Sequence, residues 1–412
     1  MESKYIEMAI PFFFLFIGIE VFVNFIKKKK YYSFKDSIND LSCGITQQIV
    51  GVFISLTLYI SLYNSFHLFD ISLNSTIAWV LCFIGVDIAY YWYHRTSHEV
   101  SAIWGSHVAH HQSEEYNLTV ALRQGAFEQY FSLWFYLPLA LLGFPPVMFF
   151  ANNQFNSIYQ FFVHTRLVNK LGPLEIMFTT PSHHRVHHGK NPKYIDRNYS
   201  GVFIIWDRIF GSFQKEEEEV VYGTVKPLKS WNPIWANFEN WVNLAKTFYK
   251  TNGLKNKFKL LIMNPGWQPE QEKFDIPEVS TDTYEKYETA IPAGLNIYAF
   301  VQFLLGLAIA LTLLEVNTKL AFWENAYLAL VSLIALSNVG GIFETKKWVL
   351  PLEVIKLILV ISFVLYQDWA INLKLPVALA CFVMLVWVFK YRRLFFSNLT
   401  SVLSFKGEEA KN

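Results

Sequence analysis

The sequence predicts an all-α polytopic membrane protein with about nine transmembrane helices. Of its 412 residues, 53% are hydrophobic and only 17% are charged, whereas soluble domains carry about 25% charged residues. The apolar residues are also gathered into runs of the roughly 20 residues that a helix needs to cross a bilayer. The formal net charge of +2 gives no indication of nucleic acid as a partner.

The first apolar run is expected to be a retained transmembrane helix, because lysines follow it rather than precede it. The fourth and fifth runs are short and are separated only by residues 143–146. A hairpin that does not fully cross the membrane is therefore an open alternative for this pair. The nine predicted spans are residues 5–26, 44–66, 76–93, 127–144, 146–165, 294–315, 321–342, 350–367 and 375–391.

Basic residues predict the orientation, because short cytoplasmic loops are enriched in lysine and arginine. Lys27–Lys30 follow the first span, Lys346 and Lys347 lie between the seventh and eighth, and Arg392 and Arg393 follow the ninth. With nine crossings, all three clusters lie in the cytoplasm and the N-terminus lies outside. The C-terminal GEEAKN contains no familiar organelle address, which favours a bacterial inner membrane over the endoplasmic reticulum.

The chain is expected to divide into five parts. These are N-terminal spans (1–75), a catalytic region (76–214), a cytoplasmic or interfacial segment (215–293), C-terminal spans (294–393) and a cytoplasmic tail (394–412). Within the third part, residues 231–250 mix tryptophan and phenylalanine with asparagine and lysine. This pattern favours a helix in the headgroup layer as much as an ordinary amphipathic packing helix.

Histidine is the most informative residue type, since ten of the 11 histidines lie between His94 and His188. Eight of them form three boxes whose spacings of three and four residues place the rings on one face of a helix. Neutral imidazole is the commonest metal ligand, and so many rings exceed what one ion can hold, so two metal ions are expected. The first box is HRTSH (His94, His98), the second is HVAHH (His107, His110, His111), and the third lies in SHHRVHHG (His184, His187, His188).

Other metal sites fit less well. HRTSH is not a metalloprotease motif, because Arg95 occupies the position of the base. The three cysteines lie in or beside apolar runs without a CxxC motif, so a structural zinc finger is not expected. Imidazole alone does not distinguish zinc, iron and copper.

Two predicted helices carry further polar residues toward the same region. Asp87 shares a helical face with His94, where it is expected to orient a ligand ring or to make a helix-packing hydrogen bond. His164 ends a polar stripe that includes Gln160 and is a further candidate ligand, and His183 is a candidate tenth ligand or hydrogen-bond donor.

Carboxylates near the boxes could balance the charge of the ions. The candidates are Glu99, Glu114, Glu115, Asp196 and Asp207. Glu99 directly follows the first box and is expected to contact a ligand or a cofactor, whereas Glu114 and Glu115 read better as solvated surface charges. His67 is expected to lie on the far side of the membrane.

The three boxes resemble those of the fatty acid hydroxylase/sterol desaturase superfamily of membrane di-iron oxygenases. Four segments are most similar to the alkylglycerol monooxygenases: GVDIAYYWYHR, EEYNLTVALRQ, FFVHTRLVNKLGPLE and TPSHHRVHHGKN. The run NYSGVFIIWDRIFGSF also fits the superfamily. The resemblance is dense over residues 83–214 and weak beyond them.

The resemblance implies two iron ions, held by the eight box histidines and His164, and insertion of one atom of O2 into a C–H bond. Some relatives have another histidine where this chain has Val168, so His183 is the substitute candidate. For the alkylglycerol monooxygenases it further implies a membrane lipid substrate, tetrahydrobiopterin as electron donor, and an ether bond cleaved to a fatty aldehyde and a glycerol.

Two alternatives remain open. A related hydroxylase or desaturase acting on sterols, carotenoids or fatty acids would have the same boxes and take electrons from a redox protein. A metal transporter or sensor would also bind ions through histidine, but its ligands should lie near the middle of the bilayer.

Overall fold

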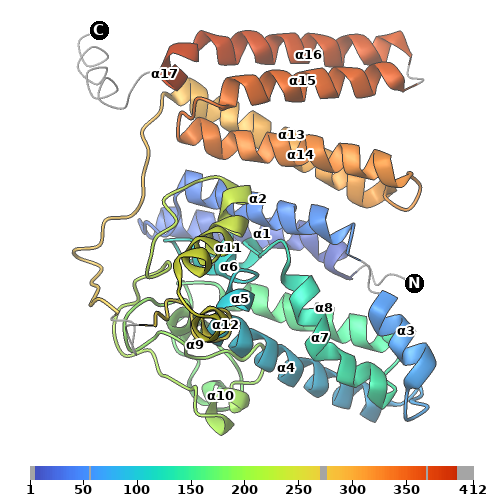
Figure 1. The fold of residues 1–412 in the computed structure, drawn as a ribbon, viewed down its shortest axis with the longest axis vertical. Helices are drawn as coiled ribbons and strands as arrows, with labels where there is room; N and C mark the ends of the chain where they lie inside the picture. The colour runs from blue at the N-terminus through green and yellow to red at the C-terminus, as the bar shows by residue number, and fades with distance from the viewer. Residues whose placement is uncertain (1–4, 55–56, 270–275, 368–369, 397–412) are drawn as a thin grey trace. The chain divides into compact units, whose positions relative to one another are not determined.

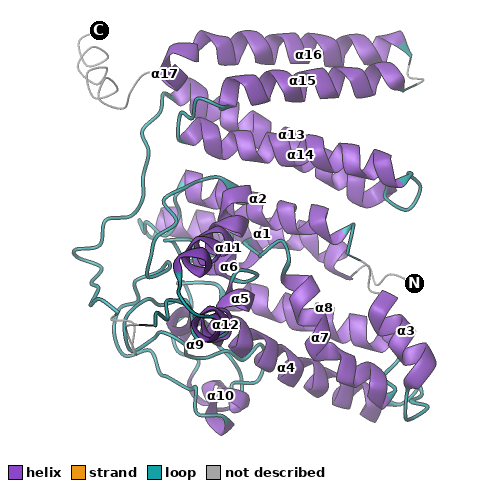
Figure 2. Cartoon of the chain, in the orientation of Figure 1, coloured by secondary structure: helices purple, strands orange, loops and turns teal. Residues whose placement is uncertain are grey.

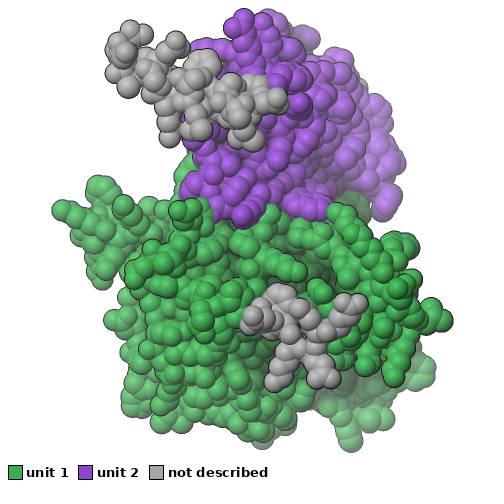
Figure 3. All heavy atoms as spheres, turned by 60° about the vertical axis from the view of Figure 1, so that its left-hand side comes forward, with its two compact units in different colours: residues 1–228, 236–286 green, residues 229–235, 287–412 purple. Residues whose placement is uncertain are grey.

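The computed structural model describes residues 5–54, 57–269, 276–367 and 370–396, which form helices and connecting loops without a strand (Figures 1 and 2). The chain forms two compact units (Figure 3). Unit 1 contains residues 1–228 and 236–286, and unit 2 contains residues 229–235 and 287–412. The five-part division stays a prediction, and most of its last part, from residue 397, lies outside the described residues.

Unit 1 contains long helices and, between them, several short ones. The long helices are α1 (Tyr5–Ile26), α2 (Phe34–Gly51), α4 (Thr76–Glu99), α7 (Glu128–Leu142), α8 (Pro146–Val163) and α11 (Pro233–Lys250), which begins in unit 2. The short helices are α3 (Thr57–Phe66), α5 (Ser101–Trp104), α6 (Val108–His111), η1 (Val120–Leu122), η2 (Gly172–Ile176), α9 (Pro181–His187), α10 (Ile205–Ile209) and α12 (Leu254–Ile262).

Six helices among the described residues are long and apolar enough to cross a membrane, so the protein is a multi-pass membrane protein. They are Met8–Ile26, Thr76–Glu99, Ala293–Val316, Phe322–Phe343, Val349–Tyr366 and Ile371–Lys390, and each corresponds to a predicted span. The predicted pair at 127–144 and 146–165 forms α7 and α8, which do not belong to this set. The count of nine crossings is therefore not confirmed.

The prediction of one span at 44–66 was wrong, because α2 ends at Gly51 and α3 starts separately at Thr57. A buried polar face on α2 explains the difference, since it binds the chain around η1. Asp40 accepts from Thr119 Oγ1 at 2.8 Å and pairs with Arg123. Gly44 permits this contact, because a Cβ there would lie 2.1 Å from the Leu122 carbonyl oxygen.

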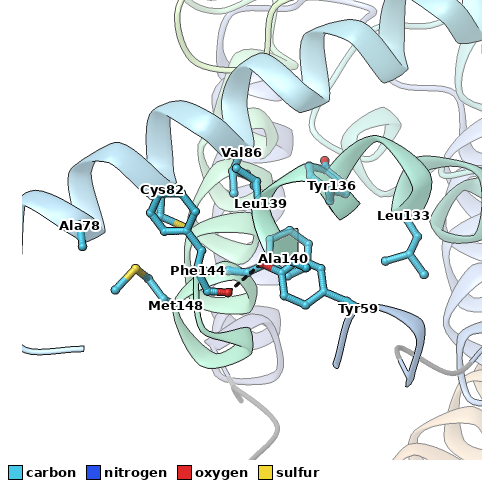
Figure 4. Close-up of a cluster of buried hydrophobic side chains, with 11 residues drawn as sticks. Tyr59, Ala78, Cys82, Val86, Leu133, Tyr136, Leu139, Ala140, Phe144 and Met148 are labelled. Atoms are coloured by element: carbon cyan, nitrogen blue, oxygen red, sulfur yellow. Dashed lines mark hydrogen bonds between the residues drawn. The ribbon is translucent and has the colours of Figure 1, made fainter. Parts of the chain in front are cut away.

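A hydrophobic cluster joins α3, α4, α7 and α8 at one end of unit 1 (Figure 4). Tyr59 stacks on Phe149 and donates to the Phe144 carbonyl at 3.0 Å. The turn between α7 and α8 fits there because Gly143 has φ +97° and no Cβ to meet the Phe69 carbonyl. The histidines of the three boxes and His164 lie at the other end, where α4 and α8 finish and α7 begins. We call this the site end.

Unit 2 consists mainly of four long helices, α13 (Ala293–Val316), α14 (Phe322–Phe343), α15 (Val349–Tyr366) and α16 (Ile371–Lys390), followed by α17 (Arg392–Phe396). A charged pair is buried among them, with Lys356 Nζ 2.7 Å from Glu353 Oε1. Tyr298, Gln302 and Asn338 also donate to the Glu353 carboxylate, at 2.5, 3.0 and 2.8 Å. Glu353 thus has partners on α13 and α14 as well as on its own helix, and Lys356 also donates to Gln302 of α13.

Replacing Lys356 with methionine should destabilise unit 2 by about 3–5 kcal/mol, because it leaves the buried Glu353 carboxylate without its cation. The double variant Glu353→Gln/Lys356→Met should recover most of that loss. Unfolding of the detergent-solubilised protein measures both, with the exposed Lys347→Met as control. Equal destabilisation by the single and double variants would contradict this account of the pair.

Candidate metal centre

Nine of the ten histidines predicted as metal ligands meet in two groups within unit 1, and all nine are buried. Inside each group the ring nitrogens lie within 4.8 Å of one another. The groups combine the ends of α4 and α8 with the short helices α6 and α9 (Figure 1). The five-histidine group is His94, His98, His107, His111 and His187, and the four-histidine group is His110, His164, His184 and His188.

The box spacings create these groups through local helix geometry. The first box occupies the last turns of α4, the second box lies on and before α6, and the third lies on and after α9. Rings three and four residues apart project from one helix face. The second and third boxes each contribute to both groups, which ties the two groups into a single centre.

Backbone carbonyl groups determine which ring nitrogen carries the hydrogen in four of these histidines. A carbonyl oxygen only accepts, so a ring Nδ1 bonded to it must carry the hydrogen, and in the neutral ring Nε2 then presents a lone pair. The four Nδ1 bonds are His94 to Tyr199 (2.7 Å), His110 to Arg123 (2.8 Å), His164 to Gln160 (2.7 Å) and His187 to Arg197 (2.9 Å).

The Nε2 atoms converge, and in one pair hydrogen bonding does not explain the distance. His164 Nε2 lies 3.2 Å from His110 Nε2, and both atoms carry lone pairs, so the pair is repulsive without a cation between them. Two nitrogens about 2.1 Å from one metal and at right angles lie about 3.0 Å apart. The other Nε2 pairs are His94–His107 (2.9 Å), His107–His111 (3.2 Å), His98–His111 (3.2 Å) and His164–His184 (3.0 Å).

Burial favours the neutral form of several of these rings, which is the form that binds a metal. Burial is the main cause that lowers the pKa of His110 to about 4, and it also lowers the pKa of His111 and His188 well below the usual value, with neighbouring histidines adding to the effect. The Nε2 atoms of His187 and His188 are buried without a hydrogen-bond partner. Such orphaned nitrogens fit a site built for cations.

Asp87 does not bind a histidine ring, although the sequence favoured it as the residue that orients a metal-ligating histidine. It accepts from Val202 N (2.7 Å), Phe203 N (3.0 Å), Trp206 Nε1 (2.9 Å) and Asn156 Nδ2 (2.7 Å). Asp207 binds the amides of Tyr199 and Ser200 at 2.8 and 2.9 Å. Together the two carboxylates hold the loop whose Tyr199 carbonyl accepts from His94.

The other predicted carboxylates fall into different places. Asp196 Oδ1 lies 3.6 Å from His98 Nδ1. Glu99 binds Arg95 at 3.0 Å and is in neither histidine group, so a contact with a ligand or cofactor stays a prediction. Glu114 accepts from the Tyr284 hydroxyl, and Glu115 pairs with Lys286 at 2.6 Å, so neither is a simple solvated charge.

Sequence reasoning missed two residues that touch the centre. Glu128, at the start of α7, has Oε1 3.7 Å from His107 Nδ1. Arg123 is buried, with its carbonyl oxygen on His110 and its guanidinium on Asp40 and Gln112. No spacing pattern could have identified them, because tertiary packing alone brings them to the boxes.

His183 and His67 lie apart from both groups. His183 Nδ1 is 3.4 Å from Thr180 Oγ1, and its ring faces Phe213. It is therefore a ligand only by prediction. His67 follows α3 and binds Asp70 at 2.9 Å, near the end of unit 1 opposite the site end.

A cavity of about 600 Å³ opens beside the five-histidine group. His98, His111 and His187 line its inner wall, and Trp104 lies beside them. The outer wall comes from α11 and α12, with Glu239, Asn240, Asn243, Lys246 and Leu260, and from the following residues up to Gln268. The predicted helix at 231–250 is thus confirmed as α11, and it packs on the site through Trp241, which donates to the Ala102 carbonyl at 2.9 Å.

His164→Ala should reduce bound metal from about two ions to about one per chain, because it removes one of four ligands from the second group. His183→Ala should leave the metal content unchanged, since its ring lies outside both groups. Elemental analysis of the purified membrane protein measures both, with His67→Ala as the matched control. Full metal in His164→Ala, or loss in His183→Ala, would revise the ligand set.

Comparison with known proteins relates this arrangement to a family. The fatty acid hydroxylase model matches residues 79–212. The chain is 38% identical over 363 residues to alkylglycerol monooxygenase from Xenopus tropicalis, covering 86% of this chain and 81% of the relative. It is 42% identical over 312 residues to alkylglycerol monooxygenase from Homo sapiens, covering 74% and 70%.

A more distant relative is an ornithine lipid hydroxylase from Rhizobium tropici, 29% identical over 135 residues, which cover 32% of this chain and 41% of the relative. No solved structure matches the chain. The alignments with the animal relatives extend far beyond the histidine boxes. Identity at this level over most of both chains shows common descent. The chain therefore belongs to the alkylglycerol monooxygenase family.

Proposed function

We propose that the chain is a membrane-bound di-iron monooxygenase that cleaves the ether bond of alkylglycerols. One observation carries the proposal: two buried groups of histidines have converging ring nitrogens at the site end, with the Nε2 lone pairs of His110 and His164 facing one another. The relatives named as alkylglycerol monooxygenases supply the substrate. The carbon next to the ether oxygen would be hydroxylated with one atom of O2, the other atom leaving as water, and the hemiacetal would collapse to a fatty aldehyde and a glycerol.

The histidine groups would hold one iron each, the first with five rings available and the second with four. When bound, the irons supply the redox chemistry with O2 that side chains cannot perform. Two electrons must come from a donor, and we propose tetrahydrobiopterin, which fits the family. The protein contributes fixed ring orientations, since the carbonyls of Tyr199, Arg123 and Gln160 each accept from a ligand Nδ1.

The cavity beside the five-histidine group would receive the polar partners of the reaction. Its volume of about 600 Å³ lies in the usual range for small-molecule sites. The amides of Asn240 and Asn243 and the charges of Glu239 and Lys246 line it, which suits the hydroxyls of a glycerol or the edge of a pterin. Apolar residues such as Val108 and Leu260 line it as well and would contact the start of an alkyl chain.

We propose that the site end faces the cytoplasm. Glu20 of α1 accepts from the Leu118 amide at 2.8 Å, and Asn117 donates to the Tyr31 carbonyl at 2.7 Å, so α1 finishes near the histidines. Lys27–Lys30 follow directly, and such clusters favour the cytoplasmic side. The preference for a bacterial inner membrane stays a prediction.

A sterol, carotenoid or fatty acid hydroxylase fed by a redox protein is the second candidate. The fatty acid hydroxylase model matches residues 79–212, the histidine region in which these enzymes would be alike, and the lipid hydroxylase from Rhizobium tropici aligns over 135 residues. A metal transporter fits less well, because the ligands gather at helix ends rather than along the middle of the spans.

Purified, iron-loaded protein in lipid nanodiscs should release hexadecanal from 1-O-hexadecylglycerol when both O2 and tetrahydrobiopterin are present. His187→Ala should lower this rate at least about 100-fold, because it removes a metal ligand, whereas His67→Ala should retain it. The assay measures the aldehyde by mass spectrometry.

The ester analogue, 1-hexadecanoylglycerol, serves as the substrate control. Hydroxylation that needs ferredoxin or cytochrome b5 instead of the pterin would favour the second candidate. Tightly bound iron without turnover of either ether or alkyl substrates would contradict both.

A further inference from the structure

Helix α12 presents an apolar face that the described residues of unit 1 leave exposed. Leu254, Phe258 and Ile262 are 87%, 63% and 45% exposed, and their spacing of four residues places them on one side of the helix. Tyr249, at the end of α11, is 81% exposed beside them in the chain. Exposed apolar residues are expected on membrane spans, but α12 has only nine residues and lies outside the candidate spans.

The same segment is strongly basic. No aspartate or glutamate occurs from residue 240 to residue 269, whereas this stretch contains five lysines. Lys257 Nζ lies 5.0 Å from the centre of the Phe248 ring, so its charge remains close to α11. The lysines are Lys246, Lys250, Lys255, Lys257 and Lys259. Apolar residues flanked by lysines are typical of helices that bind anionic lipid surfaces.

The position of α12 agrees with binding to an anionic lipid surface. The Ser101 amide donates to the Met263 carbonyl at 3.0 Å, and Ser101 lies two residues after the end of α4, which is a candidate span. The end of α12 is thus fixed beside the point where α4 leaves the apolar layer. The opposite side of α12 is buried at Leu260, which lines the cavity next to the five-histidine group.

We propose that α12 lies in the headgroup layer of an anionic membrane leaflet. Leu254, Phe258 and Ile262 enter the apolar boundary, and the lysines bind lipid phosphates. Because Leu260 faces the cavity, the lipid-bound helix forms the wall between the leaflet and the site. If the proposed function holds, an ether lipid enters the cavity along this wall from the leaflet in which it already resides.

A nitroxide on Phe258→Cys tests the location without any measurement of activity. In vesicles containing phosphatidylglycerol, the label should relax with oxygen, which concentrates in lipid, more than with a water-soluble nickel reagent. A label on Glu278→Cys, on an exposed loop residue, gives the aqueous reference. The three native cysteines are buried, and the unsubstituted chain measures their background.

A separate variant tests whether the lysines bind the anionic lipid. Lys255→Gln/Lys257→Gln/Lys259→Gln should move the label toward the nickel reagent in anionic vesicles and make its depth insensitive to phosphatidylglycerol content. Lys170→Gln/Lys215→Gln/Lys229→Gln, which removes three exposed charges elsewhere, should change neither.

Two results would overturn the proposal. A label at Phe258 that reacts with the nickel reagent in every vesicle would place α12 in water. A label shielded from both reagents would show that protein, such as a second copy of the chain, covers the face. Because iron loading and turnover play no part in these measurements, a failure here leaves the oxygenase proposal untouched, and the reverse also holds.

Discussion

Imidazole lone pairs forced toward one another are the feature on which the rest of unit 1 depends. The carbonyls of Arg123 and Gln160 each take a ring hydrogen, on His110 and His164, and so leave two Nε2 lone pairs 3.2 Å apart. Neutral rings would separate if they were free to turn. They are not free, because each is held from behind by a backbone group. A cation between the two rings would make this arrangement favourable, so the histidine clusters fit a metal site.

Buried polar groups behind the histidines hold in place the backbone carbonyls that bind the rings. Asp87 and Asp207 bind the amides around Tyr199, and Arg123 ties the α6 backbone at Ala109 to Asp40 of α2. Charges buried in this way are costly unless they are fully hydrogen-bonded, and here each carboxylate accepts several donors. The polar face of α2 is therefore part of the support of the centre, and the α2–α3 segment cannot form one apolar span.

Local spacing allowed the three boxes and His164 to be predicted, because helix geometry alone places such rings together. The six apolar spans were equally predictable, since length and hydrophobicity decide them. The features that depend on long-range packing could not be predicted. Glu128 approaches His107 from 21 positions away, and Asp87 binds loop amides that no pattern links to it. The run at 44–66 misled for the same reason, because buried Asp36 and Asp40 upstream determine where α2 lies.

The two histidine groups differ in ways that assign them different roles. In the five-histidine group, the Nδ1 atoms of His98 and His107 face carboxylates, at 3.6 Å from Asp196 and 3.7 Å from Glu128. Each group also has carbonyl partners on two Nδ1 atoms, so the carboxylates are what distinguishes the five-histidine group. Carboxylates behind the rings increase their basicity and offset positive charge at a metal. Three rings of the five-histidine group line the cavity, compared with His188 alone from the other group. If each group holds an ion, the ion in the five-histidine group would therefore have more of its ligands at the cavity.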